Sequence, residues 1–164
     1  MKRILVTGGA GFIGSHTVDL LLKKGYQVRI LDALQDRVHP NGWPNYLPKD
    51  IEKLKGDVRS SEDWEQALKD IDGVIHLAAY QDYMTDFSTF HHVNTVGATL
   101  LYEQIIANKF DVQKVVLASS QATYGEGTYR CDAHGLQYPP PRPSKQLENG
   151  DWDLHCPECS GLMD

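Results

Sequence analysis

Short apolar runs alternate with segments of helical spacing through the first 120 residues of the chain. The runs predict strands over residues 3–7, 26–32, 54–59, 73–79 and 114–120. The segments between them predict helices over residues 16–24, 60–68 and 94–102. This alternation predicts an α/β fold with a doubly wound parallel sheet, helices on both faces and the first strand near the centre. Residues 35–55 and 80–92 lack such a pattern and are expected to be irregular.

A glycine-rich turn joins the first strand to the first helix. Gly9-x-Gly11-x-x-Gly14 fits the dinucleotide-binding pattern, and Gly8-x-x-Gly11-x-x-Gly14 occupies the same residues. Glycines let backbone N–H groups approach a pyrophosphate, and the helix N-terminus adds partial positive charge. A tight strand-to-helix turn would also explain glycines alone, but the strand and helix on either side favour a Rossmann fold. The expected cofactor-binding residues are Gly8, Gly11, Phe12, Ile13 and Gly14.

Two acidic residues at strand ends extend the predicted cofactor site. Asp32 ends the second strand, 18 residues after Gly14. A carboxylate there accepts hydrogen bonds from the ribose diol and repels a 2′-phosphate, so it favours NAD over NADP; a solvated acid is the alternative. Asp57 and Val58 fit the adenine side of the site, and a strand-to-helix cap explains them equally well. We expect residues 35–55 to cover the adenosine side without contributing chemistry.

Composition narrows the classes of partner. The chain has 164 residues and a net charge of −6, which argues against nucleic acid and against anionic membranes. Its apolar runs are too short to span a bilayer, and the N-terminal run is too short for a signal peptide. We therefore expect a cytoplasmic protein. Three cysteines fit reduced thiols or a metal site better than a disulfide framework.

The three cysteines and one histidine form two short motifs. Cys131-x-x-His134 and Cys156-x-x-Cys159 are separated by 21 residues. Two such pairs joined by a loop predict a closed Cys₃His site for a structural zinc, since four protein ligands leave no open position for water. His155 is a rival fourth ligand, and unrelated free cysteines are the plain alternative. The predicted domains are an NAD-binding Rossmann domain over 1–127 and a zinc-ribbon-like insertion over 128–164.

Five motifs in order resemble a known family. They are Thr7–Gly14, Asp57-Val58-Arg59, His76–Ala79, Asn94-Thr95-x-Gly97 and Ser119-Ser120-x-x-x-Tyr124-Gly125. Over residues 1–125 the chain resembles the extended short-chain dehydrogenase/reductase family of nucleotide-sugar epimerases and dehydratases. The resemblance implies bound NAD that oxidises a sugar hydroxyl and later returns the hydride. It also implies roles for Ser120, which would contact the reacting sugar oxygen, for Asn94 at the active site, and for Leu77, Ala78 and Ala79 beside the cofactor.

The family's tyrosine base, followed four residues later by lysine, has no match here. Tyr124, Tyr129 and Tyr138 are followed at that spacing by threonine, alanine and arginine. We therefore expect the N-terminal portion of a longer enzyme, inactive alone and without its substrate domain, whose parent could be a homodimer. The segment after Tyr124-Gly125 resembles that of dTDP-L-rhamnose 4-epimerase-like proteins, which implies a nucleotide-sugar 4-epimerase acting at C4 on a dTDP-linked substrate. The alternatives are a 4,6-dehydratase and a non-catalytic NAD-binding module with a zinc-stabilised interaction loop.

Overall fold

A computed structural model describes residues 2–81 and 84–164 of the chain. It forms two compact units, residues 1–118 and residues 119–164, which are treated separately below. The boundary expected at 127/128 lies within the second unit and remains a prediction. None of the helices in the described part of the chain has the length and apolarity needed to cross a membrane.

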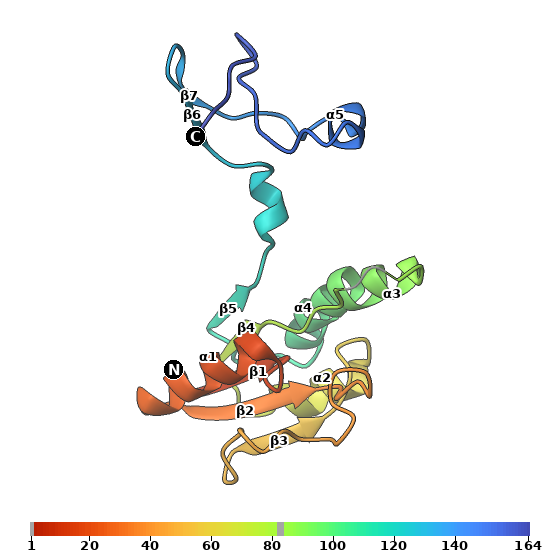
Figure 1. Cartoon of the computed structure of the whole chain (residues 1–164). Helices are drawn as coiled ribbons and strands as arrows, with labels where there is room; N and C mark the ends of the chain where they lie inside the picture. Colours follow the sequence, from red (N-terminus) through yellow and green to blue (C-terminus); the bar gives the residue numbers. More distant parts are fainter. Residues whose placement is uncertain (1, 82–83) are drawn as a thin grey trace. The chain divides into compact units, whose positions relative to one another are not determined.

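The first unit is built on a five-stranded parallel sheet (Figure 1). Its strands are β1 (Arg3–Thr7), β2 (Gln27–Asp32), β3 (Glu52–Lys55), β4 (Gly73–His76) and β5 (Lys114–Leu117). They lie in the order β3-β2-β1-β4-β5, with β1 at the centre. In this register Thr7 lies between Leu31 of β2 and His76 of β4. The predicted doubly wound parallel sheet is confirmed, and its carboxyl edge collects the ends of β1, β2 and β4.

Helices cover the sheet on two faces because its buried residues alternate. Ile4 and Val6 pack with Val18 of α1 (Phe12–Lys23). Leu5 belongs to a separate cluster and packs with Trp64 of α2 (Ser61–Leu68) and Leu101 of α4 (Gly97–Ala107). Full burial of side chains of this kind stabilises a fold by about 1.5–3 kcal/mol each.

A local signal sets the start of α2, whereas pairing with β2 sets the bounds of β3. The side chain of Ser60 caps α2 by accepting a hydrogen bond from the Asp63 N–H at 3.2 Å, as its residue type predicts. The strand predicted over 54–59 was placed too late. β3 covers Glu52–Lys55, pairing Leu54 with Leu31, and the chain leaves the sheet at Gly56. Asp57 consequently lies in the loop beyond the strand.

The helix predicted over 94–102 begins earlier than expected. α3 (Phe87–His91) continues through a π-helical turn, η1 (His92–Val96), into α4. The α3 sequence shows no apolar periodicity because none of its residues is buried, and only Val93 is buried in η1. The sequence pattern therefore reports the helix only where it packs against the sheet.

The second unit has little regular structure. It contains a 3₁₀ turn, η2 (Gln121–Tyr124), a hairpin of β6 (Tyr129–Cys131) and β7 (Gly135–Gln137), and the short helix α5 (Ser144–Glu148). Its buried core is Cys131, Leu154, Cys156 and Met163. Since two of these four residues are cysteines, the core offers little apolar burial to stabilise the fold.

Candidate cofactor site and metal cluster

The turn after β1 is shaped by close backbone approaches. Gly8 has φ +67°, and a Cβ there would lie 2.9 Å from Cα of Ala78 in the loop after β4. A Cβ on Gly14 would lie 2.0 Å from the Gly8 carbonyl oxygen. Both positions exclude larger residues, so the glycines let helix α1 start directly against the turn.

The first turn of α1 follows the glycine turn directly and offers main-chain donors to a ligand. Its first main-chain bond runs from the Ser15 N–H to the Gly11 carbonyl at 2.9 Å. The N–H groups of Phe12, Ile13 and Gly14 come before this first donor and therefore have no acceptor within the helix. The first turn of α1 holds no acidic residue, so nothing within it opposes an incoming anion. This arrangement can bind a phosphate or pyrophosphate.

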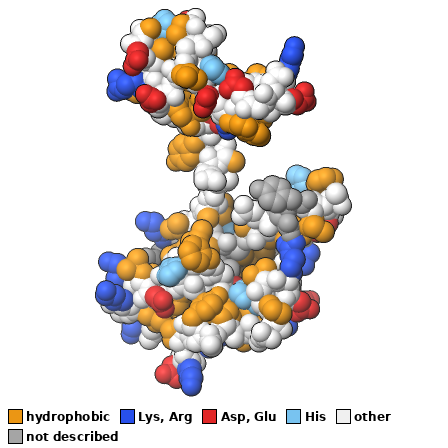
Figure 2. Space-filling model, in the orientation of Figure 1, with side chains coloured by type: hydrophobic (Ala, Val, Ile, Leu, Met, Phe, Trp, Pro, Cys, Tyr) orange, Lys and Arg blue, Asp and Glu red, His pale blue; other side chains and the backbone are white. Residues whose placement is uncertain are grey.

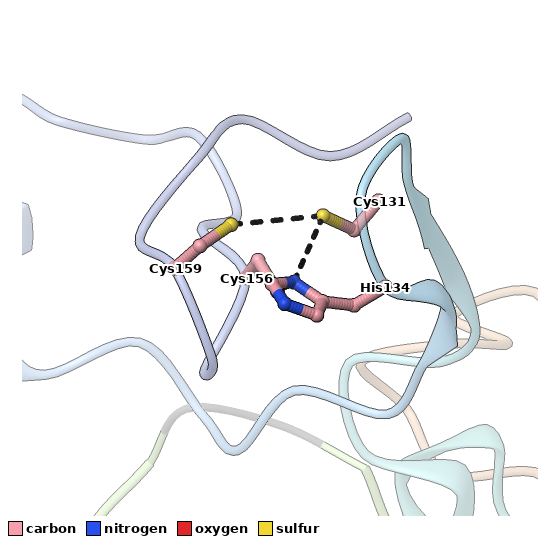
Figure 3. Close-up of side chains that lie close together, drawn as sticks. All are labelled: Cys131, His134, Cys156 and Cys159. Carbon is pink, nitrogen blue, oxygen red and sulfur yellow. Dashed lines mark hydrogen bonds between the residues drawn. The ribbon is translucent and has the colours of Figure 1, made fainter.

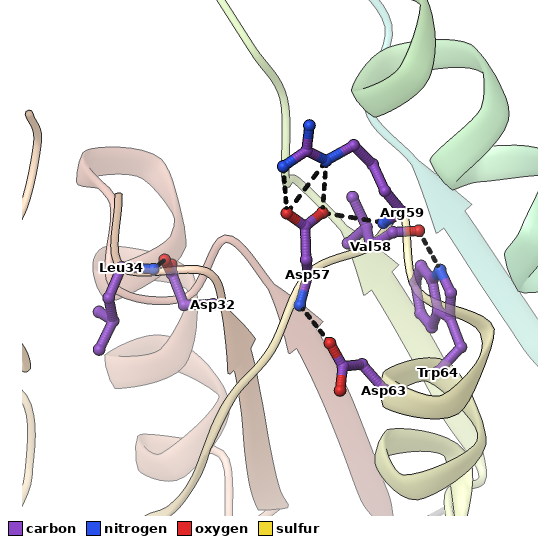
Figure 4. A network of polar contacts seen from close by, with 7 residues as sticks. All are labelled: Asp32, Leu34, Asp57, Val58, Arg59, Asp63 and Trp64. Atoms are coloured by element: carbon purple, nitrogen blue, oxygen red, sulfur yellow. Dashed lines mark hydrogen bonds and ion pairs between the residues drawn. The ribbon is translucent and has the colours of Figure 1, made fainter. Parts of the chain in front are cut away.

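Asp32 lies beside the turn at the end of β2. Its Oδ2 accepts a hydrogen bond from the Ala10 N–H at 2.9 Å, and its Oδ1 accepts one from the Leu34 N–H at 2.9 Å. The second bond closes a tight turn in which Leu34 adopts φ +49° (Figure 4). A carboxylate has about four acceptor positions, so two remain for a ribose diol.

A cavity at the carboxyl edge of the sheet joins these elements. Its walls include eight of the residues predicted to bind the cofactor, whereas Phe12, Ile13, Gly14 and Asn94 lie outside its lining. The eight are Gly8, Gly11, Asp32, Asp57, Val58, Leu77, Ala78 and Ala79. Open α/β sheets bind ligands at this edge, where the strand order reverses. The further lining residues are Leu31, Ala33, Gln35, Val38, His39, Gly56 and Val93.

The loop after β2 contributes residues to the cavity wall and to the glycine turn, which the sequence did not indicate. Gln35, Val38 and His39 line the cavity, and the Tyr46 hydroxyl donates to the Ala10 carbonyl at 2.5 Å. The expectation that residues 35–55 contribute no chemistry missed them. In a segment without periodicity, the residue types do not indicate which other residues they contact. The one available indication was that this segment follows a strand ending in an acidic residue.

Asp57 is held by the neighbouring Arg59. The guanidinium donates from Nη2 to Asp57 Oδ2 at 2.6 Å and from Nε to both carboxylate oxygens (Figure 4). Partial burial raises the pKa of Asp57, but the bonds from Arg59 outweigh it and hold that pKa below its ordinary value. The Asp57 N–H donates to Asp63 of α2. These bonds fix the position of Asp57 in the cavity wall. Its contact with adenine remains a prediction.

Buried polar residues fix the loop that carries Ala78. Thr7 Oγ1 accepts hydrogen bonds from the N–H groups of Leu77 at 3.2 Å and Ala78 at 3.1 Å. The same hydroxyl lies 2.7 Å from Nδ1 of His76. Burial lowers the pKa of His76 to about 4. His76 is therefore neutral at pH 7 and forms part of the buried polar network that holds this loop.

The structure places Asn94 and Ser120 in backbone-capping roles. Asn94 Oδ1 accepts from the Tyr80 N–H at 2.8 Å, and its Nδ2 donates to the Tyr80 carbonyl at 2.9 Å. Ser120 belongs to the second unit, where its hydroxyl accepts from the Ala122 N–H at 3.1 Å and caps η2. Their expected roles at the reacting centre stay predictions.

The four predicted metal ligands lie together in the second unit (Figure 3). Cys131 Sγ is 3.7 Å from Cys159 Sγ and 3.7 Å from His134 Nδ1, and Cys156 Sγ is 3.5 Å from the same nitrogen. All four ligand atoms lie within 4.8 Å of one another. Around a tetrahedral zinc, sulfur ligands lie about 3.8 Å apart, and sulfur and nitrogen about 3.5 Å apart. The spacings fit that geometry.

Backbone N–H groups favour the thiolate form of Cys131, and the second candidate histidine has other partners. The N–H of His134, aided by that of Ala133, lowers the pKa of the Cys131 thiol to about 6, which favours the thiolate that binds metals. The rival ligand His155 lies outside the cluster. Its Nε2 is 2.9 Å from Asp151 Oδ2, and its Nδ1 is 3.2 Å from the Ser160 carbonyl oxygen.

Comparison with known proteins gives the family. The family model described as NAD dependent epimerase/dehydratase matches residues 4–146. The chain belongs to this family. The confirmed resemblance is to enzymes that depend on NAD and act on nucleotide sugars.

Individual relatives share the same region. A dTDP-L-rhamnose 4-epimerase of Burkholderia thailandensis is 35% identical, over 93% of this chain and 44% of that protein. A UDP-glucose 4-epimerase of Neisseria meningitidis is 38% identical, over 77% of this chain and 39% of that protein. The crystal structure of Thermus thermophilus UDP-glucose 4-epimerase in complex with NAD superposes with TM-score 0.66 at 35% identity, covering 86% of this chain and 44% of that one. The chain spans less than half the length of these relatives.

Proposed function

We propose that this chain is the NAD-binding part of a nucleotide-sugar 4-epimerase. The observation that carries the proposal is the convergence of the glycine turn, Asp32 and the Ala78–Ala79 backbone on one cavity at the carboxyl edge of the sheet. The NAD-bound structure of a relative supports this choice of cofactor.

Each part of the cavity has a defined task in this proposal. The N–H groups of Phe12, Ile13 and Gly14 bind the pyrophosphate, and the close approach at Gly8 leaves room for it. Asp32 binds the ribose diol and disfavours a 2′-phosphate by charge repulsion. Bound NAD supplies hydride transfer at the sugar C4. Ser120 orients the reacting sugar hydroxyl.

The substrate is a nucleotide sugar, and we favour a dTDP-linked one. The relative that matches over 93% of this chain is named for dTDP-L-rhamnose. Another relative is named for UDP-glucose, which makes a UDP-linked sugar the alternative substrate. A 4,6-dehydratase is the second candidate, because it would use the same NAD-binding residues. For either candidate we propose a cytoplasmic enzyme that forms a homodimer.

The isolated chain is proposed not to turn over substrate. Its sequence contains no tyrosine followed four residues later by lysine, the pair that would supply a general base with a lowered pKa. A binding module without catalysis therefore describes these 164 residues taken alone. Epimerisation of UDP-glucose or a dTDP-sugar by the purified chain would contradict this part of the proposal.

The second unit is proposed to bind a structural zinc through Cys131, His134, Cys156 and Cys159. The support is the tetrahedral spacing of the ligand atoms and the small apolar core, which leaves the metal to order the loops. Both units carry acidic as well as basic side chains on the face drawn in Figure 2, and the net charge of −6 does not favour nucleic acid.

Asp32→Ala tests the cofactor assignment. It should raise the Kd for NAD at least about tenfold by calorimetry, since a buried charge-assisted hydrogen bond contributes about 1.5–3 kcal/mol. Asp111→Ala, an exposed acid in the loop before β5, is the matched control and should leave the Kd unchanged. Equal affinity of wild type and Asp32→Ala would remove Asp32 from the site.

Metal analysis tests the zinc assignment. The purified protein should contain about one zinc per chain, and Cys159→Ser should lower that content strongly. Glu158→Gln alters an exposed neighbour within the same Cys-x-x-Cys segment and should keep the metal. A well-folded, metal-free second unit would dispose of the assignment.

A further inference from the structure

The carbonyl of Ala10 is held by a residue far away in sequence. Ala10 is fully buried in the glycine turn, directly before Gly11, the N-cap of helix α1. Its N–H donates to Asp32, and its carbonyl accepts from the Tyr46 hydroxyl at 2.5 Å. Both main-chain polar groups of Ala10 are therefore hydrogen-bonded, the N–H to the end of β2 and the carbonyl to the loop after β2.

We propose that Tyr46 is a positioning residue for the pyrophosphate-binding turn. The inference rests on the proposed NAD site and assigns a role to a loop for which the sequence indicated none. The Ala10 carbonyl and the Gly11 nitrogen belong to one planar peptide unit. Fixing the carbonyl therefore fixes the plane of that unit, directly before the Phe12 N–H that opens the helix.

The contacts of Gly11 show why this plane matters. Its N–H donates to the Gly8 carbonyl at 3.1 Å, and its own carbonyl accepts the first helical bond from Ser15. Rotation of the Ala10–Gly11 peptide would break the first bond and tilt the second. Without the Tyr46 hydroxyl, the buried Ala10 carbonyl would also lose its partner, which favours such a rotation.

Tyr46 acts through its hydroxyl rather than through burial of its ring. The residue is 57% exposed, so removal of one oxygen alters little packing. The effect expected is therefore on the geometry of the turn and on the affinity for a pyrophosphate ligand, with a loss of stability no larger than that of one buried hydrogen bond. Asp32 alone would still hold the Ala10 N–H.

Tyr46→Phe tests the proposal, with Tyr102→Phe, an exposed tyrosine of α4, as control. We expect the Kd for NAD to rise about fivefold to tenfold by calorimetry in Tyr46→Phe alone, the loss of one hydrogen bond. The amide ¹⁵N resonance of Gly11, whose nitrogen shares the peptide with the Ala10 carbonyl, should shift in Tyr46→Phe and stay in place in the control.

The outcomes separate this inference from the proposed function. If the wild type does not bind NAD, the proposed function fails. If the wild type binds NAD and Tyr46→Phe binds it equally well, or leaves the Gly11 resonance unmoved, the role of Tyr46 is overturned. A fall in melting temperature without a change in NAD affinity would show a purely structural contact and would also overturn it.

Discussion

The hydroxyl of Thr7 donates a hydrogen bond to Nδ1 of His76 across strands β1 and β4, at 2.7 Å. The direction follows from the other partners of that hydroxyl. Its oxygen already accepts from the Leu77 and Ala78 N–H groups, so its proton is the only group left to face the ring. Nδ1 of His76 is therefore an acceptor, and the neutral ring carries its proton on Nε2.

Protonation of His76 should destabilise the first unit. Because burial lowers its pKa from 6.5 to about 4, the unfolded chain binds more protons than the folded chain between those values. Stability is complete above about pH 6.5 and falls as the pH drops toward 4, by up to about 3 kcal/mol. Denaturant unfolding of wild type and His76→Asn from pH 7 to pH 4 measures how the free energy of unfolding depends on pH. A wild type whose stability follows that of His76→Asn at every pH would refute this role.

Thr7→Val should damage the loop that borders the cofactor cavity. Valine keeps the shape of threonine but leaves the Ala78 N–H and His76 Nδ1 without their partner, so we expect a loss of about 2–3 kcal/mol. Thr7→Ser retains the hydroxyl and loses one buried methyl, at a cost of about 1 kcal/mol. Chemical denaturation compares the two. Equal losses would mean that the methyl group, rather than the hydrogen bonds, matters at this position.

Arg29 stabilises the end of α2. Its Nη1 donates to the carbonyls of Ala67 at 2.8 Å and Lys69 at 2.7 Å, and its Nη2 lies 2.8 Å from Glu52 on β3. Arg29→Met should cost about 2 kcal/mol in unfolding free energy because these carbonyls lose their donor. Glu52→Gln should cost less than about 1 kcal/mol, since the glutamate is half-exposed. A greater loss in Glu52→Gln would assign the effect to the ion pair instead.

Removal of metal should unfold the second unit selectively. Its core contains only four buried residues, two of them proposed ligands, whereas the first unit has a helix-covered sheet of its own. After treatment with a chelator, limited proteolysis should cut within residues 119–164 and leave residues 1–118 protected. Resistance of both units to the protease in the metal-free protein would show that the second unit folds without metal.

The sequence predicted those parts of the fold whose signals are local. The glycine turn, the cap at Ser60 and the apolar strands each depend on neighbouring residues, and the structure contains them all. The pairing of Cys131-x-x-His134 with Cys156-x-x-Cys159 was also predictable, because short spacings restrict the geometry of each pair.

Contacts between distant segments left no such signal. Arg29 stands in an apolar strand, and nothing near it in sequence indicates that it meets the carbonyls at the end of α2. Tyr46 lies in an irregular loop, and its partner Ala10 is 36 residues away. The end of β3 was missed for a related reason, since its register is set by pairing with β2 rather than by its own residues.

A calorimetric titration of the wild-type chain with NAD and with NADP tests the central claim most directly. The account predicts that NAD binds and that the Kd for NADP is at least about tenfold higher, because Asp32 repels the added 2′-phosphate. Failure to bind NAD, or equal affinity for both dinucleotides, would contradict it.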